Sequence, residues 1–117
     1  MSNRTYNLEE RTAKFGEAII SFASKLKETS IIKSLVGQIV RSGTSIGANY
    51  MEADWADSKK DFRHKIGICK RESKETMHWL RMIAKADSKS AKECRSLWKE
   101  AHELALIFSS IVRRIKQ

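Results

Sequence analysis

The stretch from Gln38 to Glu52 limits most strongly what this chain can fold into. At about 100° of rotation per residue, the apolar side chains in and around it fall on one helical face. That face consists of Ile32, Leu35, Val36, Ile39, Gly43, Ile46, Tyr50 and Ala53. A helix with one such face buries it against other helices, so the pattern favours a helical bundle over a sheet.

Two glycines, Gly43 and Gly47, lie one turn apart on this predicted helix. An interior glycine costs about 1 kcal/mol of helix stability relative to alanine. We therefore expect another backbone to pack closely against this region, and we assign Gly43 to packing or assembly.

A polar stripe runs beside the apolar face at spacings of three and four residues. Its members are Gln38, Ser42, Ser45, Asn49 and Glu52. One interpretation is that Arg41 and this stripe fix helix register or join subunits; the alternative is contact with a ligand. Buried polar groups need hydrogen-bond partners, and for Glu52 we expect a cation on another helix. The candidates are Lys70, Arg71 and Lys74.

The remaining sequence contains three more amphipathic stretches and no proline. The predicted helices cover about residues 8–27, 31–55, 58–85 and 90–115, with short links between them. The predicted N-terminal caps are Asn7 with Glu10, Thr29 or Ser30, Ser58 with Asp61, and Ser90 with Glu93. The expected fold is all-α, a single domain of 117 residues built as an up-down-up-down four-helix bundle.

The location of the protein is predicted from what the sequence lacks. No apolar run approaches the roughly 18 residues of a membrane span, and the first residues have no apolar signal segment. We therefore expect a cytoplasmic protein without a membrane partner. Cys69 and Cys94 are predicted to be core thiols rather than a disulfide.

The charge of the chain is +9 and is unevenly distributed. Residues 58–87 hold nine basic and four acidic residues, and residues 88–117 hold seven and three. Such an excess favours a polyanion partner, nucleic acid before an anionic membrane surface. We expect contacts to phosphate, which give affinity and salt dependence but little sequence preference. The predicted phosphate-binding residues are Arg63, Lys70, Arg71, Lys74, Arg81, Arg95 and Lys99.

Two patterns could carry chemistry. Glu75 and His78 form an E-x-x-H, the unit that di-iron bundles use twice, but the sequence has no second copy. We therefore predict no metal and no cofactor. The pairs Arg71 with His78 and Arg95 with His102 loosely match helical ribonucleases of the HEPN class, in which Arg and His serve phosphodiester cleavage. A metal-independent ribonuclease is thus the enzymatic alternative, and a purely structural protein scaffold is the other.

Two blocks of residues resemble a family of bacterial four-helix bundle proteins. The first block is Gln38, Arg41, Ser45-Ile46, Asn49 and Glu52. The second is Ser58, Phe62, Glu72, Glu75-Thr76 and Trp79-Leu80. The family includes proteins encoded in intervening sequences of 23S ribosomal RNA genes and the accessory variability determinant of diversity-generating retroelements. The resemblance covers about residues 8–112 and departs at Gly47, where the family often has proline, and at Gly67-Ile68-Cys69.

The resemblance implies a fold, an assembly and a class of partner. It implies an up-down bundle that forms a ring-like homo-oligomer, typically a pentamer, and no established enzymatic activity. For the retroelement branch it implies RNA binding and association with a reverse transcriptase. Accordingly we assign Arg41, Ser45, Asn49, Glu52, Glu72 and Glu75, together with Gly43, to packing and assembly. The expected function is non-enzymatic binding of RNA, with DNA as the other nucleic acid.

Overall fold

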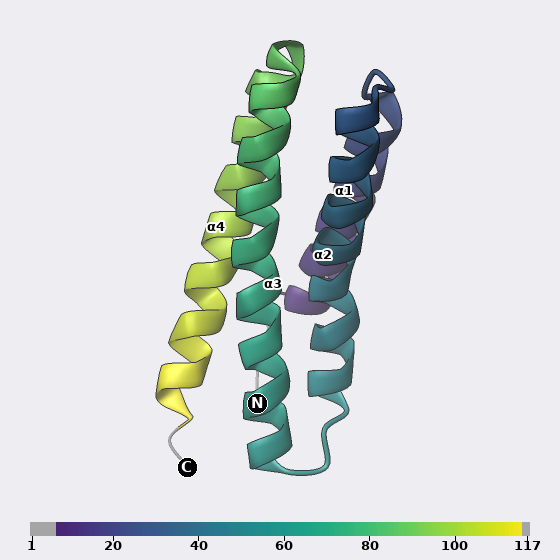
Figure 1. The fold of residues 1–117 in the computed structure, drawn as a ribbon. Helices are drawn as coiled ribbons and strands as arrows, with labels where there is room; N and C mark the ends of the chain where they lie inside the picture. The colour runs from purple at the N-terminus through teal and green to yellow at the C-terminus, as the bar shows by residue number, and fades with distance from the viewer. Residues whose placement is uncertain (1–6, 116–117) are drawn as a thin grey trace.

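A computed structural model describes residues 7–115, and these form an all-α bundle of four long helices (Figure 1). The helices are α1 (Leu8–Lys25), α2 (Ser30–Asp54), α3 (Lys59–Ala86) and α4 (Ala91–Arg114), with a short 3₁₀ turn, η1 (Ser88–Ser90), before α4. Consecutive helices run antiparallel, and the molecule measures 45 × 20 × 20 Å. The predicted four-helix fold is confirmed.

The helices are arranged as two pairs. α1 packs mainly on α2, and α4 packs mainly on α3, while α2 and α3 form the broad central contact. α1 and α4 touch each other only slightly within the described residues. All four helices contribute to one core. Its largest fully buried apolar side chains are Tyr50, Phe22, Phe108, Leu8, Ile19, Ile39, Ile46, Ile66, Leu80, Ile83 and Leu104.

Two of the predicted helix caps are confirmed and two are wrong. The side chain of Thr29 accepts a hydrogen bond from the backbone N–H of Ile32, and that of Ser58 accepts one from the N–H of Asp61. Asn7 makes no side-chain cap, because its backbone is left-handed at φ 46° and ψ 58°. Ser90 likewise makes no side-chain cap at the start of α4.

Ser90 belongs to η1, so it does not cap α4 as the sequence predicted. Its φ of −88° and ψ of 0° differ from the extended backbone of a capping serine. Its hydroxyl donates instead to the carbonyl oxygen of Asp87, 2.8 Å away. The side chain of Asp87 in turn accepts from the N–H of Lys89 and so caps the 3₁₀ turn.

The α1–α2 contact is close because small residues meet there. A Cβ atom added to Gly43 would lie 2.9 Å from Cγ1 of Ile19, and one added to Gly47 would lie 3.4 Å from the carbonyl oxygen of Thr12. Gly16 of α1 similarly faces Thr44 of α2. The close approach that the two glycines predicted is therefore present.

No helix in residues 7–115 is both long enough and apolar enough to cross a bilayer. Cys69 and Cys94 are free thiols and are buried. The prediction that these residues are core thiols is therefore confirmed.

We expect Gly43→Ala and Gly37→Ala to change stability in opposite directions. At Gly43 the new methyl group meets the fully buried Ile19, so overpacking should exceed the gain in helix propensity and lower the free energy of unfolding by about 1 kcal/mol. At Gly37 nothing lies within 4 Å, so the substitution should raise it by about 0.5–1 kcal/mol. Urea unfolding measures both, and a Gly43→Ala variant as stable as the wild type would contradict the tight contact.

We expect the protein to lose stability at alkaline pH because of Cys69. Burial raises the pKa of this thiol to about 12, whereas a thiol in an unfolded chain ionises near pH ~8.5. Between these values the unfolded state loses the proton that the folded state keeps, so the free energy of unfolding falls by about 1.4 kcal/mol per pH unit.

The measurement is the urea midpoint of the wild type and of Cys69→Ala from about pH 8 to pH 10. The free energy of unfolding should fall less steeply with pH in the variant, and the difference in slope should correspond to one proton. Burial also raises the pKa of Cys94, so some dependence should remain. Equal slopes in the two proteins would rule out Cys69 as the cause.

Candidate nucleic-acid interface

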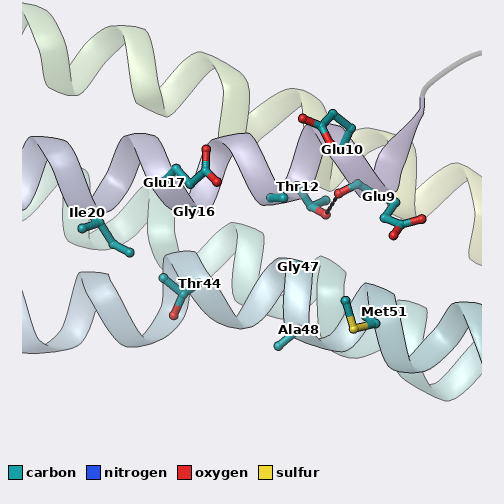
Figure 2. Close-up of a pocket in the computed structure, with 11 residues that line it drawn as sticks. Glu9, Glu10, Thr12, Gly16, Glu17, Ile20, Thr44, Gly47, Ala48 and Met51 are labelled. Atoms are coloured by element: carbon teal, nitrogen blue, oxygen red, sulfur yellow. Dashed lines mark hydrogen bonds between the residues drawn. The ribbon is translucent and has the colours of Figure 1, made fainter.

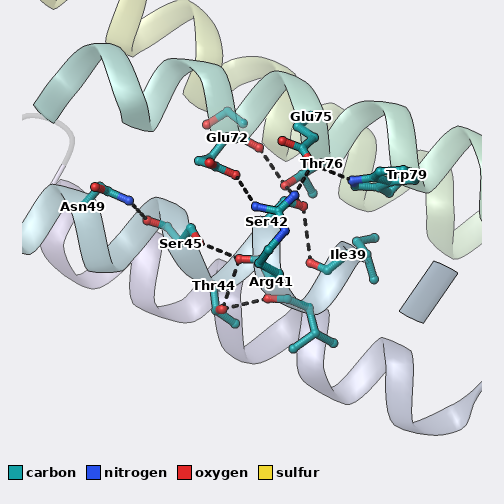
Figure 3. Close-up of polar contacts among 12 residues, drawn as sticks. Ile39, Arg41, Ser42, Thr44, Ser45, Asn49, Glu72, Glu75, Thr76 and Trp79 are labelled. Carbon is teal, nitrogen blue, oxygen red and sulfur yellow. Dashed lines mark hydrogen bonds and ion pairs between the residues drawn. The ribbon is translucent and has the colours of Figure 1, made fainter. Parts of the chain in front are cut away.

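Arg41 joins α2 to α3 through two carboxylates (Figure 3). Its Nη1 lies 3.3 Å from Oε1 of Glu72, and its Nη2 forms an ion pair with Oε2 of Glu75. Nε1 of Trp79 donates to the same Glu75 oxygen at 3.0 Å. Four of the residues that carry the family resemblance thus form one connected network on the outer edge of the α2–α3 contact.

A second polar contact lies inside the same interface. The hydroxyl oxygens of Ser42 and Thr76 are 2.9 Å apart, and both side chains are fully buried. Thr76 also lies 2.8 Å from the carbonyl oxygen of Glu72. Because a buried hydroxyl without a partner is costly, this pair favours a single register of α3 against α2.

Ser45, Asn49 and Glu52 of the polar stripe are also bound within the fold, whereas Gln38 is exposed. Ser45 donates to the carbonyl oxygen of Arg41 at 2.7 Å, and Asn49 donates to that of Ser45 at 2.9 Å. Glu52 pairs with Lys65 of α3 at 2.6 Å. The expected cation on another helix is therefore present, but the candidates Lys70, Arg71 and Lys74 were wrong. Lys65 lies on the side of α3 that faces α2, whereas the other three lie further around the helix.

The carboxylate of the E-x-x-H, that of Glu75, is therefore already engaged. Glu75 is bound by Arg41 and Trp79, and His78 is exposed with its ring 4.9 Å from the ring of Trp79. No group of three or more His, Cys, Asp or Glu side chains suited to a metal ion occurs in the part of the chain that the structure describes.

The two Arg/His pairs lie along single helices. Arg71 and His78, like Arg95 and His102, are seven residues apart, a rise of about 10 Å along a helix. His102 is exposed and its ring stacks on that of Trp98, with ring centroids 5.0 Å apart.

All of the excess positive charge belongs to the half of the chain that forms α3 and α4. Residues 1–57 contain seven basic and seven acidic residues, while residues 58–117 contain sixteen and seven. The described residues of these halves form the two helix pairs that lie side by side in Figure 1. The bundle thus has an electrically balanced α1–α2 pair and a basic α3–α4 pair.

The seven predicted phosphate-binding residues all face outward on the basic pair. Arg63, Lys70, Lys74 and Arg81 are spaced by seven, four and seven residues, so they form one stripe along α3. Lys70 is half-buried, and the other six are exposed: Arg63, Arg71, Lys74, Arg81, Arg95 and Lys99. Within residues 7–115 none of the seven has a carboxylate oxygen within 4.0 Å.

Other cations of the bundle form ion pairs with carboxylates. Most of these pairs join two helices, and one lies within α1. Arg11 of α1 pairs with Glu100 at 2.7 Å and with Glu103 at 3.0 Å, both on α4. The hydrogen bond with Glu100 is the main reason that the pKa of Arg11 is raised. Apart from the exposed Lys14–Glu10 pair within α1, the ion pairs thus link helices, unlike the unpaired cations on the surface of α3 and α4.

One groove on the α1–α2 pair is lined by carboxylates. A groove of about 350 Å³ runs between α1 and α2 (Figure 2), over small residues that include Gly16, Gly47 and Ala48. Three carboxylates, those of Glu9, Glu10 and Glu17, also line it. Within the described residues, the α3–α4 pair therefore carries the excess of cations, and this groove between α1 and α2 carries three carboxylates.

We expect Arg41→Ala to destabilise the bundle because it leaves Glu72, whose side chain is 12% exposed, without its cation. The loss should be about 1–2 kcal/mol, and Arg41→Lys should recover part of it, because an ammonium bridges two carboxylates less well than a guanidinium. The control is Lys14→Ala, which breaks an exposed pair with Glu10 at 3.9 Å and should cost less than about 0.5 kcal/mol. Urea unfolding compares the three variants, and equal losses for both alanine variants would remove the role of Arg41.

Comparison with known proteins agrees with this architecture. The family described as 23S rRNA-intervening sequence protein matches residues 4–110. A crystal structure from Bacteroides thetaiotaomicron VPI-5482, described as a protein with unknown function from the S23 ribosomal protein family, has a TM-score of 0.79 to this chain. It is 29% identical, and the match covers 90% of this chain and 97% of that one.

No curated protein matches the chain. The family match, however, spans nearly the whole chain and both blocks of residues that carry the resemblance. The chain therefore belongs to the 23S rRNA-intervening sequence protein family.

Proposed function

We propose that this protein is a non-enzymatic RNA-binding protein that contacts the phosphate backbone through the outer surface of α3 and α4. The observation that carries the proposal is the stripe of unpaired cations on a helix pair with all of the net positive charge. Lysine and arginine without carboxylate partners bind phosphate without first breaking an ion pair. The family name supports RNA over DNA as the nucleic acid.

Assembly is the second part of the proposal. A ring of identical subunits, with five as the expected number, would present the same basic surface repeatedly. Several weak phosphate contacts then act together, and avidity raises the affinity without any new kind of contact. We place this complex in the cytoplasm, with a reverse transcriptase or another protein as a further partner.

The test is RNA binding as a function of salt. We expect the wild type to bind a structured RNA at low salt and log K to fall linearly with log[salt], with a slope of about −0.9 per phosphate contact. The triple variant Arg71→Gln/Lys74→Gln/Arg81→Gln should bind more weakly and lose about three units of that slope for each subunit in contact. Fluorescence anisotropy with a labelled RNA at several salt concentrations gives both quantities.

The matched control removes three cations from α1, α2 and the segment that joins them. Lys14→Gln/Lys27→Gln/Lys33→Gln changes the net charge equally but should leave the slope nearly unchanged, since all three positions lie before α3. An RNA affinity that does not depend on salt concentration would contradict the proposed surface. So would equal losses of affinity in the two triple variants. Cleavage of the RNA that is lost in His78→Ala or His102→Ala would favour the ribonuclease alternative instead.

A further inference from the structure

Trp55 is a large apolar side chain that the fold leaves open to solvent. It ends α2, where its backbone N–H bonds to the carbonyl oxygens of Glu52 and Ala53, and it is 81% exposed. The other two tryptophans are engaged: Trp79 donates to Glu75, and Trp98 stacks on His102. Within residues 7–115 the indole of Trp55 has no hydrogen bond and no ring partner.

Cations surround a cavity at the same end of the bundle. The cavity has a volume of about 400 Å³ and is lined by Lys59, Lys60, Arg63 and Ile115. This volume lies within the range of roughly 300–1,000 Å³ that is typical of small-ligand sites. Arg113 and Arg114, in the last turn of α4, are two more exposed cations close in sequence to Ile115.

The cavity is held together by a contact between two helices. Nε of Arg63 donates to the carbonyl oxygen of Ile115 at 2.9 Å, which fixes the end of α4 against the beginning of α3. Long cationic side chains can line such a cavity with their methylene stems and keep their charges at its rim. The apolar interior suits a flat ring, and the rim suits phosphate.

Only four positions in the sequence separate Trp55 from Lys59, the first residue that lines this cavity. Four residues of chain span at most about 14 Å when fully extended, so the Cα atoms of Trp55 and Lys59 are no further apart than this. Figure 1 shows the end of α2, the beginning of α3 and the end of α4 at the same end of the molecule. Lys60 and Arg63 also begin the basic side of α3 that continues to Lys85.

We propose that this end of the bundle binds an unpaired nucleotide of the RNA, with Trp55 as the stacking surface for a base. Proteins bind single-stranded nucleic acids by combining cations that contact the backbone with exposed aromatic rings, which can stack on any base because every base has a π face. Bases in a duplex are already stacked and cannot reach Trp55. The proposal rests on the RNA binding proposed above and deepens it: the substrate is RNA with a single-stranded loop or end.

The experiment compares three labelled RNAs of equal length: a blunt duplex, a hairpin with an unpaired loop, and a single strand. We expect Trp55→Leu to weaken binding of the hairpin and the single strand by at least about fivefold, which is the lower range for loss of one base stack. Binding of the duplex should not change. Trp55→Phe keeps an aromatic ring and should stay within about twofold of the wild type.

The control is Ile31→Ala, at the other end of α2, which removes an exposed side chain, 63% accessible, without an aromatic ring. It should leave all three affinities unchanged. Lys59→Gln/Lys60→Gln should weaken the hairpin more than the duplex. Thermal unfolding of each variant shows whether its fold is intact, and because Trp55 is outside the core we expect no loss.

The outcomes separate the two proposals. If the wild type binds none of the RNAs at low salt, the proposed function fails and the stacking site fails with it. If the wild type binds and the α3 triple variant weakens binding while Trp55→Leu has no effect, only the stacking site is overturned. Equal losses of duplex and hairpin in Trp55→Leu, or a Trp55→Leu effect only on capture of a protein partner, would also overturn it.

Discussion

The contact between α2 and α3 is the interaction on which the rest of the structure depends. α1 is attached mainly to α2 and α4 mainly to α3, so this contact holds the two helix pairs together. Its buried Ser42–Thr76 pair and the Arg41 network at its edge are polar, and they are satisfied in one register. Apolar packing alone tolerates small slips between helices, whereas polar groups that must meet do not.

The fold could be predicted because each helix carries its own signals. Helical periodicity and the absence of proline defined four helices, and Thr29 and Ser58 were recognised as caps from local sequence. Asn7 and Ser90 show the limit of that reasoning, because the same residue types occur at caps and in turns. A left-handed backbone at Asn7 and a 3₁₀ turn at Ser90 prevent the bonds that their sequence pattern predicted.

Features of the candidate site that follow from residue spacing along a single helix could be predicted from the sequence. Contacts between two helices could not. The outward stripe on α3 follows from spacing alone, and the structure places these residues on one face. The partner of Glu52 depends on the register between α2 and α3, so Lys65 was missed. Trp55 was missed as well, because its position at the end of a helix says nothing about whether a neighbouring element covers it.

The slight contact between α1 and α4 has a consequence for how the molecule opens. α1 is anchored along one side by the glycine-lined contact with α2, and across the other by the ion pairs of Arg11 with Glu100 and Glu103. Detaching α1 therefore exposes less buried surface than separating α2 from α3. Local opening should therefore begin with the detachment of α1, while α2, α3 and α4 stay packed together. The free energy of this opening should be lower than that of global unfolding.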